Sequence, residues 1–420
     1  MGLSSAQAFT IITVLSFLLL FLHKLLSPWI ELPRLPEQWL AFRSGLAWTI
    51  FKDRVGFSED MVLDHESGFA IISSDPGRVS WNALWGHSQT SQQQGRLLLY
   101  DYGGSGSLRE MDLVNFPTTS DFHPLGIGLY REKKYSRARL FVVNQGHDKS
   151  CVEVMDIDYE DARAVHVCSV TDNNHIIRSP NSVSPVSYTS FYVTNDQCLI
   201  RRRHPFLSFT ERVLGLPLGW VTFVDFSIQS KPICTIVAGG IPFANGILVT
   251  PSGKEVLVAS TSTDIVRIYE RDPETDALSG KYSSVYMTFH PETLSFDRSL
   301  DMSDPTVFDS NGKFLRGAVA TGSPDAGRLF CMAKNPHGCV APSVVAEIRR
   351  GHGPDLSPFP GSLFNLHTKY HARTLYADDG TNYPSSTSGD MDSKRGRLIV
   401  SGLYADGILN ITWDPKENRH

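Results

Sequence analysis

Oxygen-bearing side chains stand just ahead of four of the short apolar runs in this sequence. They are Glu59 with Asp60, then Asn181, Asn245 and Asp304. Ca²⁺ takes about six to eight oxygen ligands and accepts amide as well as carboxylate oxygens, whereas Zn²⁺ favours His or Cys. Taken singly, an Asn before Gly is commonly a turn former, and an acidic pair is commonly surface charge. Their recurrence at one position in four units nevertheless predicts a calcium site to which separate units contribute.

The elements that would position these side chains are short runs of β-branched and aromatic residues bounded by turn residues. Six pairs of runs are expected to form antiparallel strands: 69–72 with 96–100, 140–143 with 152–155, 190–193 with 220–224, 256–259 with 265–269, 314–321 with 328–330, and 397–401 with 407–411. Repeated antiparallel units are typical of propeller blades, which gather ligands at one open end of a central channel. The sequence therefore predicts an all-β fold, a six-bladed β-propeller over residues 57–420, with a β-sandwich as the alternative.

The composition narrows the class of protein. Of the 420 residues, 41% are hydrophobic and 20% are charged, which favours a folded globular chain over a disordered one. Gly (33) and Pro (24) are frequent, which argues against a helical bundle. The formal net charge is -5, and the one basic run, 201–204, is interpreted as a solvated loop. We therefore expect no nucleic-acid partner.

The N-terminus is apolar and has no charged side chain before His23. The run from Leu3 to Leu26 is long enough to span about 30 Å as a helix. It lacks a clear basic region and a clear cleavage site, so residues 1–28 are predicted to be an uncleaved signal-anchor, with a cleaved signal peptide as the alternative. Residues 29–56 are expected to form an N-terminal arm near the membrane. The predicted location is the secretory pathway, with the chain either anchored by one span or secreted.

Six cysteines are compatible with that location. Cys331 and Cys339 flank a loop-like segment, and a local disulfide is predicted between them. The triplet Asn410-Ile411-Thr412 is a glycosylation sequon, so Asn410 is a candidate glycan site.

Several motifs, in order along the chain, resemble the paraoxonase/arylesterase family. The most specific lie between residues 190 and 270: Phe191–Asp196, Val213–Pro217 leading to Trp220, Phe243–Ile247 and Ile265–Glu270. Ser58-Glu59-Asp60 followed by Gly68–Ser74 is similar to that family as well. The resemblance spans residues 57 to about 412 and implies a six-bladed propeller that hydrolyses lactones and aryl esters.

The resemblance also implies ligands for one or two Ca²⁺ ions in the channel. The catalytic ion would be held by Glu59, Asn181, Asn245 and Asp304. A deeper ion would be held by Asp60 and by the main-chain carbonyl of Ile127. In such a site the ion polarises the ester carbonyl, and a water attacks while a nearby base takes its proton.

The sequence departs from the family at several of these positions. The two histidines of the family's dyad fall on Leu125 and Gln145. Two further ligand positions fall on Pro305, which has no side-chain donor, and on Ser182. The candidate catalytic bases are therefore Glu59 and His123, with His147 as another histidine near a dyad position. Loss of a proton-transfer residue typically lowers a rate by about 10²- to 10⁴-fold, which weakens a hydrolase without abolishing it.

Two functional hypotheses of different classes follow. The first is a calcium-dependent hydrolase whose partner is a hydrophobic small-molecule ester or lactone. The second is a propeller that has lost the hydrolytic step, and that binds a small molecule or catalyses a non-hydrolytic rearrangement in specialised metabolism. Strictosidine-synthase-like and gluconolactonase-like propellers share the Phe243–Gly246 segment, but the flanking motifs fit them less well.

Overall fold

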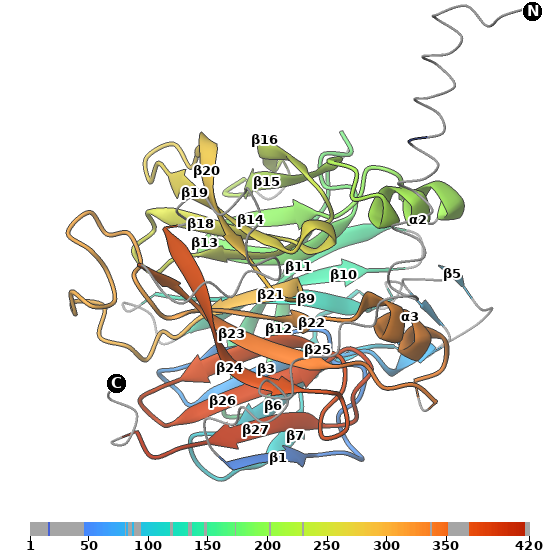
Figure 1. Cartoon of the computed structure of the whole chain (residues 1–420), viewed down its shortest axis with the longest axis vertical. Helices are drawn as coiled ribbons and strands as arrows, with labels where there is room; N and C mark the ends of the chain where they lie inside the picture. Colours follow the sequence, from blue (N-terminus) through green and yellow to red (C-terminus); the bar gives the residue numbers. More distant parts are fainter. Residues whose placement is uncertain are drawn as a thin grey trace, which may run out of the picture.

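The computed structural model describes Ser16 and residues 46–415, except for 80, 83–85, 88–93, 118–120, 133–136, 147–148, 173, 201–202, 229–230, 337 and 352–368. Six antiparallel sheets are arranged around a central axis (Figure 1), and a view turned by 90° shows them as a ring. The predicted six-bladed β-propeller is confirmed.

Each blade begins with its innermost strand and continues outward along the chain. The first blade contains β2 (Met61–Asp64), β3 (Phe69–Ser74), β6 (Arg96–Asp101) and β7 (Leu108–Glu110). The second contains β9 (Pro124–Arg131), β10 (Ala138–Gln145), β11 (Ser150–Asp158) and β12 (Arg163–Val170), with β8 (Asp112–Val114) added in parallel to β12. The third contains β13 (Pro180–Ser187), β14 (Ser190–Asn195), β15 (Gly219–Asp225) and β16 (Ile233–Ile241).

The remaining blades follow the same order. The fourth contains β17 (Ala244–Val249), β18 (Glu255–Ser260), β19 (Ile265–Arg271) and β20 (Leu278–Tyr286). The fifth contains β21 (His290–Phe296), β22 (Ala318–Ser323), β23 (Ser343–Arg350) and β24 (Tyr370–Asp378). The sixth contains β25 (Ser386–Asp392), β26 (Arg397–Gly402) and β27 (Ile408–Thr412). A separate two-stranded sheet joins β4 (Trp81–Asn82) and β5 (Gly86–His87).

The ring is closed by a strand from the other end of the sequence. β1 (Leu46–Ile50) pairs antiparallel with β27, so that Leu46 lies opposite Thr412 and Ile50 opposite Ile408. This strand completes the sixth blade, which therefore combines residues from both ends of the chain. The arm expected at residues 29–56 is corrected accordingly, because its residues 46–50 are part of the propeller.

Middle strands such as β10 contain apolar runs because each blade buries both of its faces against its neighbours. In β10, Leu140 and Val142 pack with Ile71 of the first blade. The alternate residues Phe141 and Val143 pack with Phe191 of the third blade. Successive side chains of a strand point to opposite faces, so a blade between two neighbours requires an apolar residue at each position.

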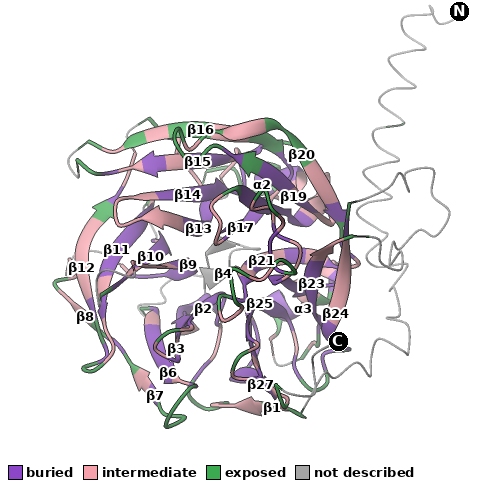
Figure 2. Ribbon diagram, turned by 90° about the vertical axis from the view of Figure 1, so that its left-hand side faces the viewer, coloured by how far each residue is buried: buried purple, intermediate pink, exposed green. Residues whose placement is uncertain are grey.

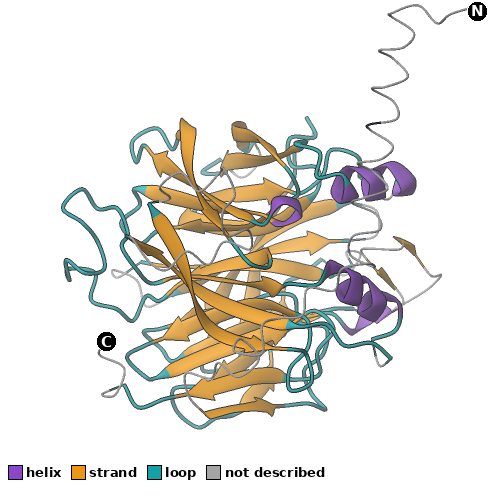
Figure 3. Ribbon diagram, viewed as in Figure 1, coloured by secondary structure: helices purple, strands orange, loops and turns teal. Residues whose placement is uncertain are grey.

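Two helices follow second strands of blades and lie at the same end of the ring (Figure 3). α2 (Pro205–Val213) follows β14, and α3 (Ala326–Lys334) follows β22; short 3-10 turns η1 (Pro76–Val79) and η2 (Thr261–Thr263) follow β3 and β18. The rings of Phe209 in α2 and Phe330 in α3 lie 6.2 Å apart. The innermost strands begin at this end, because each second strand runs antiparallel to its inner neighbour.

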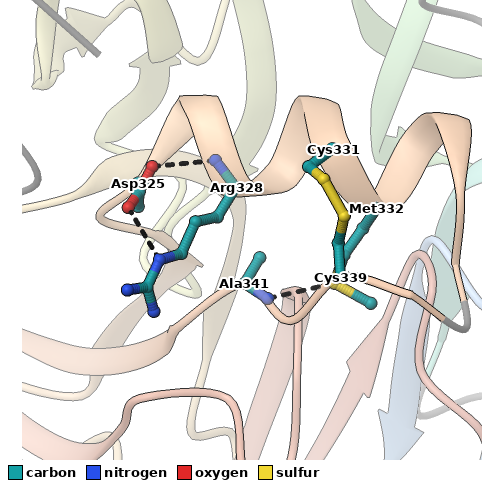
Figure 4. The surroundings of a disulfide bond; sticks show 6 residues. All are labelled: Asp325, Arg328, Cys331, Met332, Cys339 and Ala341. Carbon is teal, nitrogen blue, oxygen red and sulfur yellow. Dashed lines mark hydrogen bonds and ion pairs between the residues drawn. A yellow bond between two sulfur atoms is a disulfide. The ribbon is translucent and has the colours of Figure 1, made fainter. Parts of the chain in front are cut away.

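Helix α3 corrects the strand predicted at 328–330. The side chain of Asp325 accepts a hydrogen bond from the amide of Arg328 at 2.9 Å, which is a helix N-cap and starts a helix at this point (Figure 4). The partner strand of β22 is instead β23. The predicted Cys331–Cys339 disulfide is confirmed, and it ties α3 to the loop that leads to β23.

The predicted signal-anchor and most of the predicted arm lie outside the described residues. Within the part of the chain that the structure describes, no helix has the length and apolar character needed to cross a bilayer. The anchor therefore stays a prediction.

Candidate functional site

Polar side chains gather at the helix-covered end of the channel, where the innermost strands begin. Glu59 precedes β2, Asn181 and Asn245 are the second residues of β13 and β17, and Glu292 is the third residue of β21. The amide nitrogen of Asn245 donates a hydrogen bond to Glu292. That of Asn181 lies 3.4 Å from the carboxylate of Asp196, which follows β14. Four different blades thus contribute to one polar cluster.

Burial and mutual repulsion define the electrostatics of this cluster. Burial raises the pKa of Glu59, and the Asp196 carboxylate adds to the rise while Arg78 opposes it. Burial also raises the pKa of Asp196. Burial together with the charge of Glu59 raises the pKa of Glu292 to about 8. Glu59 and Asp196 are buried and Glu292 is half-buried, and a cation stabilises carboxylates in such an arrangement.

The donor set is suited to a hard cation. Oxygen Oε2 of Glu59 is buried and accepts no hydrogen bond from the described residues. Glu59 and Glu292 offer carboxylates, and Asn181 and Asn245 offer amide oxygens. No three His, Cys, Asp or Glu side chains of the described residues are grouped to hold a metal ion, so two amides are needed to complete the set. Ca²⁺ accepts such mixed oxygen ligands, and the residues present fit one ion.

Asp304 is not part of this set, which corrects the expectation from the sequence. It lies in the loop between β21 and β22, beyond the end of β21 that is remote from Glu292. Its side chain is 35% exposed, accepts a hydrogen bond from the amide of Thr306 at 2.8 Å and lies 3.6 Å from the guanidinium of Arg316. Glu292 occupies the place in the fifth blade that Asp304 was expected to fill.

The deeper site does not fit a second ion. Both oxygens of Asp60 already accept hydrogen bonds, one from the amide of Ile127 at 2.8 Å and the other from Met61 and from the hydroxyl of Ser388 at 2.7 Å. It is the amide of Ile127, and not its carbonyl, that faces Asp60. Burial raises the pKa of Asp60 to about 7. With Ser182 in place of a second carboxylate, this position has too few free anionic oxygens for Ca²⁺.

Comparison with known proteins identifies the family of this chain. A family model described as Arylesterase matches residues 66–299. The chain belongs to the arylesterase family. It is 31% identical over 281 residues to the chicken (Gallus gallus) serum paraoxonase/arylesterase 2, a match that covers 63% of this chain and 72% of that protein.

Other matches are shorter or more distant. The mouse (Mus musculus) serum paraoxonase/arylesterase 1 is 30% identical over 179 residues, which are 42% of this chain and 47% of that protein. The chain thus spans about half the length of that relative. A solved luciferin-regenerating enzyme is 10% identical, with a TM-score of 0.49 over 88% of this chain and 96% of that one.

The arylesterase-family dyad positions carry no catalytic group in this chain. Leu125 is buried in the apolar core between the second and third blades. The side chain of Gln145 donates to the carbonyl of Pro180 at 3.0 Å. His147 lies outside the described residues.

His123 is buried and held between two carboxylates. Its Nδ1 lies 3.0 Å from Asp75, and its Nε2 lies 3.8 Å from Asp121. Arg78 connects this pair to the candidate ligands, because its guanidinium lies 3.7 Å from Asp75 and 4.0 Å from Glu59. Asp75 and Arg78 thus connect His123 to Glu59, which is the geometry of a positioning residue.

A different histidine lies beside the ligands and was missed by sequence reasoning. His290 is two residues before Glu292, and its Nδ1 lies 2.5 Å from the carboxylate of Asp264. Burial lowers the pKa of His290, but the charge and hydrogen bond of Asp264 and the charge of Glu292 raise it, to about 9 overall. The sequence does contain a signal for Glu292, because the run Leu294–Phe296 that follows it could have been read as the innermost strand of the fifth blade.

Asn410 lies in β27, where it is paired with Trp48 of β1 and Ile399 of β26. Only 3% of its surface is exposed. A glycan on this side chain does not fit the folded strand, so the expected glycosylation site is corrected.

Proposed function

We propose that this chain is a calcium-dependent hydrolase that acts on lactones or aryl esters. The observation that carries the proposal is the convergence of oxygen donors from four blades in one cluster with Glu59, whose buried Oε2 accepts no hydrogen bond from the described residues. Membership of the arylesterase family and the names of the chicken and mouse relatives support the same reaction class.

The residues of the site would have separate roles in binding the ion and in proton transfer. Glu59, Asn181, Asn245 and Glu292 would hold the ion. Bound there, a calcium ion supplies the positive charge that polarises an ester carbonyl and stabilises the developing oxyanion. His290, fixed by Asp264, is positioned beside Glu292 to exchange a proton with the reacting groups. The substrate is a hydrophobic small molecule.

A second candidate function is favoured by one specific feature. Leu125 contributes to the apolar core at the place where the family carries a histidine. A propeller that retained the calcium site and lost hydrolysis would bind such a molecule, or rearrange it, without cleaving an ester.

One experiment separates the two. The purified full chain is assayed with phenyl acetate and with δ-valerolactone, with calcium and with EDTA, together with Asn245→Ala and the exposed control Asn311→Ala. We expect turnover that EDTA abolishes and calcium restores, that Asn245→Ala lowers at least tenfold and that Asn311→Ala leaves unchanged. Rates that neither EDTA nor Asn245→Ala affects would refute the calcium mechanism. Calcium binding without turnover of either substrate would favour the second function.

A further inference from the structure

One arginine beside the candidate ligands has no assigned role. Arg212 lies in the last turn of α2, a helix at the end of the ring where the innermost strands begin (Figure 3). The carboxylates of Asp196 and Glu292, together with Glu211 and Tyr404, are its electrostatic neighbours. Its guanidinium carbon lies 5.2 Å from the ring centre of Phe243, the residue two before Asn245. Arg212 thus belongs to the wall of the site.

The helix that carries Arg212 is firmly held. The adjacent Glu211 accepts hydrogen bonds from the amides of Cys198 and Leu199 at 2.9 and 2.8 Å. The hydroxyl of Ser262 in η2 donates to the carbonyl of Arg212 at 3.0 Å. These contacts fix the backbone of Arg212 without using its guanidinium.

The guanidinium itself has an N–H donor that makes no hydrogen bond with the described residues. Its Nε is buried without a hydrogen-bond partner, and Arg212 has no ion pair within 4.0 Å among the described residues. Arg78, which lies 4.0 Å from Glu59, differs, because it donates to the carbonyl of Pro124 at 3.0 Å and lies 3.7 Å from Asp75. A buried polar group without a partner is costly, so such a group commonly binds an ordered water or a ligand.

We propose that Arg212 binds a carboxylate of the substrate, so that the preferred substrates are esters or lactones that also carry a carboxylate group. This inference rests on the proposed hydrolase function. A guanidinium offers a planar pair of N–H donors that matches a carboxylate, and the Phe243 ring holds its plane. A singly charged carboxylate suits the site better than a phosphate dianion, because Glu59, Asp196 and Glu292 repel additional negative charge.

The test compares two esters of similar size, 4-acetoxybenzoate and its neutral methyl ester. Arg212→Met removes the charge and keeps a side chain of similar length. Arg212→Lys keeps the charge but lacks the planar pair of N–H donors. Arg267→Met is the matched control, since Arg267 also stacks on an aromatic ring, that of Tyr282 at 4.6 Å, on the surface of the fourth blade. The measured quantity is kcat/KM for the acid divided by kcat/KM for the methyl ester, which cancels general effects on catalysis.

We expect this ratio to fall about 10- to 100-fold in Arg212→Met, the usual effect of losing a charge-assisted hydrogen bond. Arg212→Lys should lose less, and Arg267→Met should match the wild type. The melting temperature of each variant is measured alongside, because Arg212→Met also loses the interaction with the charges of Asp196 and Glu292 and the contact with the Phe243 ring. A ratio unchanged in Arg212→Met, while the methyl ester is still hydrolysed, overturns the inference and leaves the proposed function intact.

If neither ester is hydrolysed, the proposed function fails, and binding of benzoate then decides the role of Arg212. Titration calorimetry of the full chain, with and without calcium, should give a Kd for benzoate at least tenfold weaker in Arg212→Met than in the wild type. Equal affinities, or no binding to the wild type, overturn the inference. If Arg212→Met does not fold, the same comparison with Arg212→Lys, which is expected to weaken binding of the acid by a smaller factor, decides it.

Discussion

The fifth-blade ligand offers the sharpest test of the site, because two acidic residues compete for the role. Glu292 lies beside Asn245 in the buried cluster, whereas Asp304 lies in a solvent-accessible loop beside Arg316. The substitutions Glu292→Gln and Asp304→Asn each replace a carboxyl group that can give its charge to a bound ion with an amide of the same shape. They therefore differ mainly in where the charge is lost.

The size of the effect follows from burial. One unit charge acting on another at 4 Å is worth about 4 kcal/mol at an effective dielectric constant of 20, and about 1 kcal/mol in bulk water. Part of that interaction is offset by solvation of the free ion and by the relief of repulsion between Glu292 and Glu59. We expect Glu292→Gln to weaken calcium binding by about 2–3 kcal/mol, or roughly 30- to 150-fold. Asp304→Asn should leave the affinity within about twofold.

Calcium titration by calorimetry measures both variants directly, and circular dichroism checks that both fold. Hydrolysis of phenyl acetate at saturating calcium gives an independent readout, in which Glu292→Gln should remain slow and Asp304→Asn should match the wild type. Equal affinities for Glu292→Gln and the wild type would refute the ligand assignment. A large loss in Asp304→Asn would instead restore the sequence-based choice.

Two further predictions concern stability. The disulfide closes a loop whose cysteines are 8 residues apart. The double variant Cys331→Ser, Cys339→Ser should therefore lower the free energy of unfolding by about 2.5 kcal/mol, because the unfolded chain gains conformational freedom. Urea unfolding measures this change, and a double variant as stable as the wild type would contradict it. Burial raises the pKa of Asp390 from 3.8 to about 6, so the folded state holds this proton more tightly than the unfolded state does. The contribution of this proton to the free energy of unfolding is complete below pH 3.8 and is lost as the pH rises through 6. Asp390→Asn should therefore gain stability relative to the wild type between pH 5 and pH 7.5, by about 1.4 kcal/mol, because about one pKa unit of the shift lies above pH 5, and parallel melting curves across that range would show the reasoning to be wrong.

The blades could be recognised from local pattern. Runs such as 140–143 are apolar at each position, and a strand buried on both faces requires that pattern. Glu59, Asn181 and Asn245 were recognised as oxygen donors ahead of the predicted strands, although the innermost strands β2, β13 and β17 were not among the predicted pairs. The Cys331–Cys339 pair was equally local, since a short loop keeps its two ends close.

Other features depend on contacts between distant residues. Leu46–Ile50 is an unremarkable apolar run until β27 provides an edge for it, and residues 328–330 become helical once Asp325 caps them. Glu292 lies near the start of β21 and Asp304 in the loop after its end, and the direction of β21 decides which of them faces the channel's open end. Arg212 resembles a surface residue in sequence. Its importance arises because the fold buries its Nε beside Glu292 and Phe243 and leaves that nitrogen without a partner. Local sequence fixes which strands form, whereas the electrostatic environment of a charge depends on all the elements that pack around it.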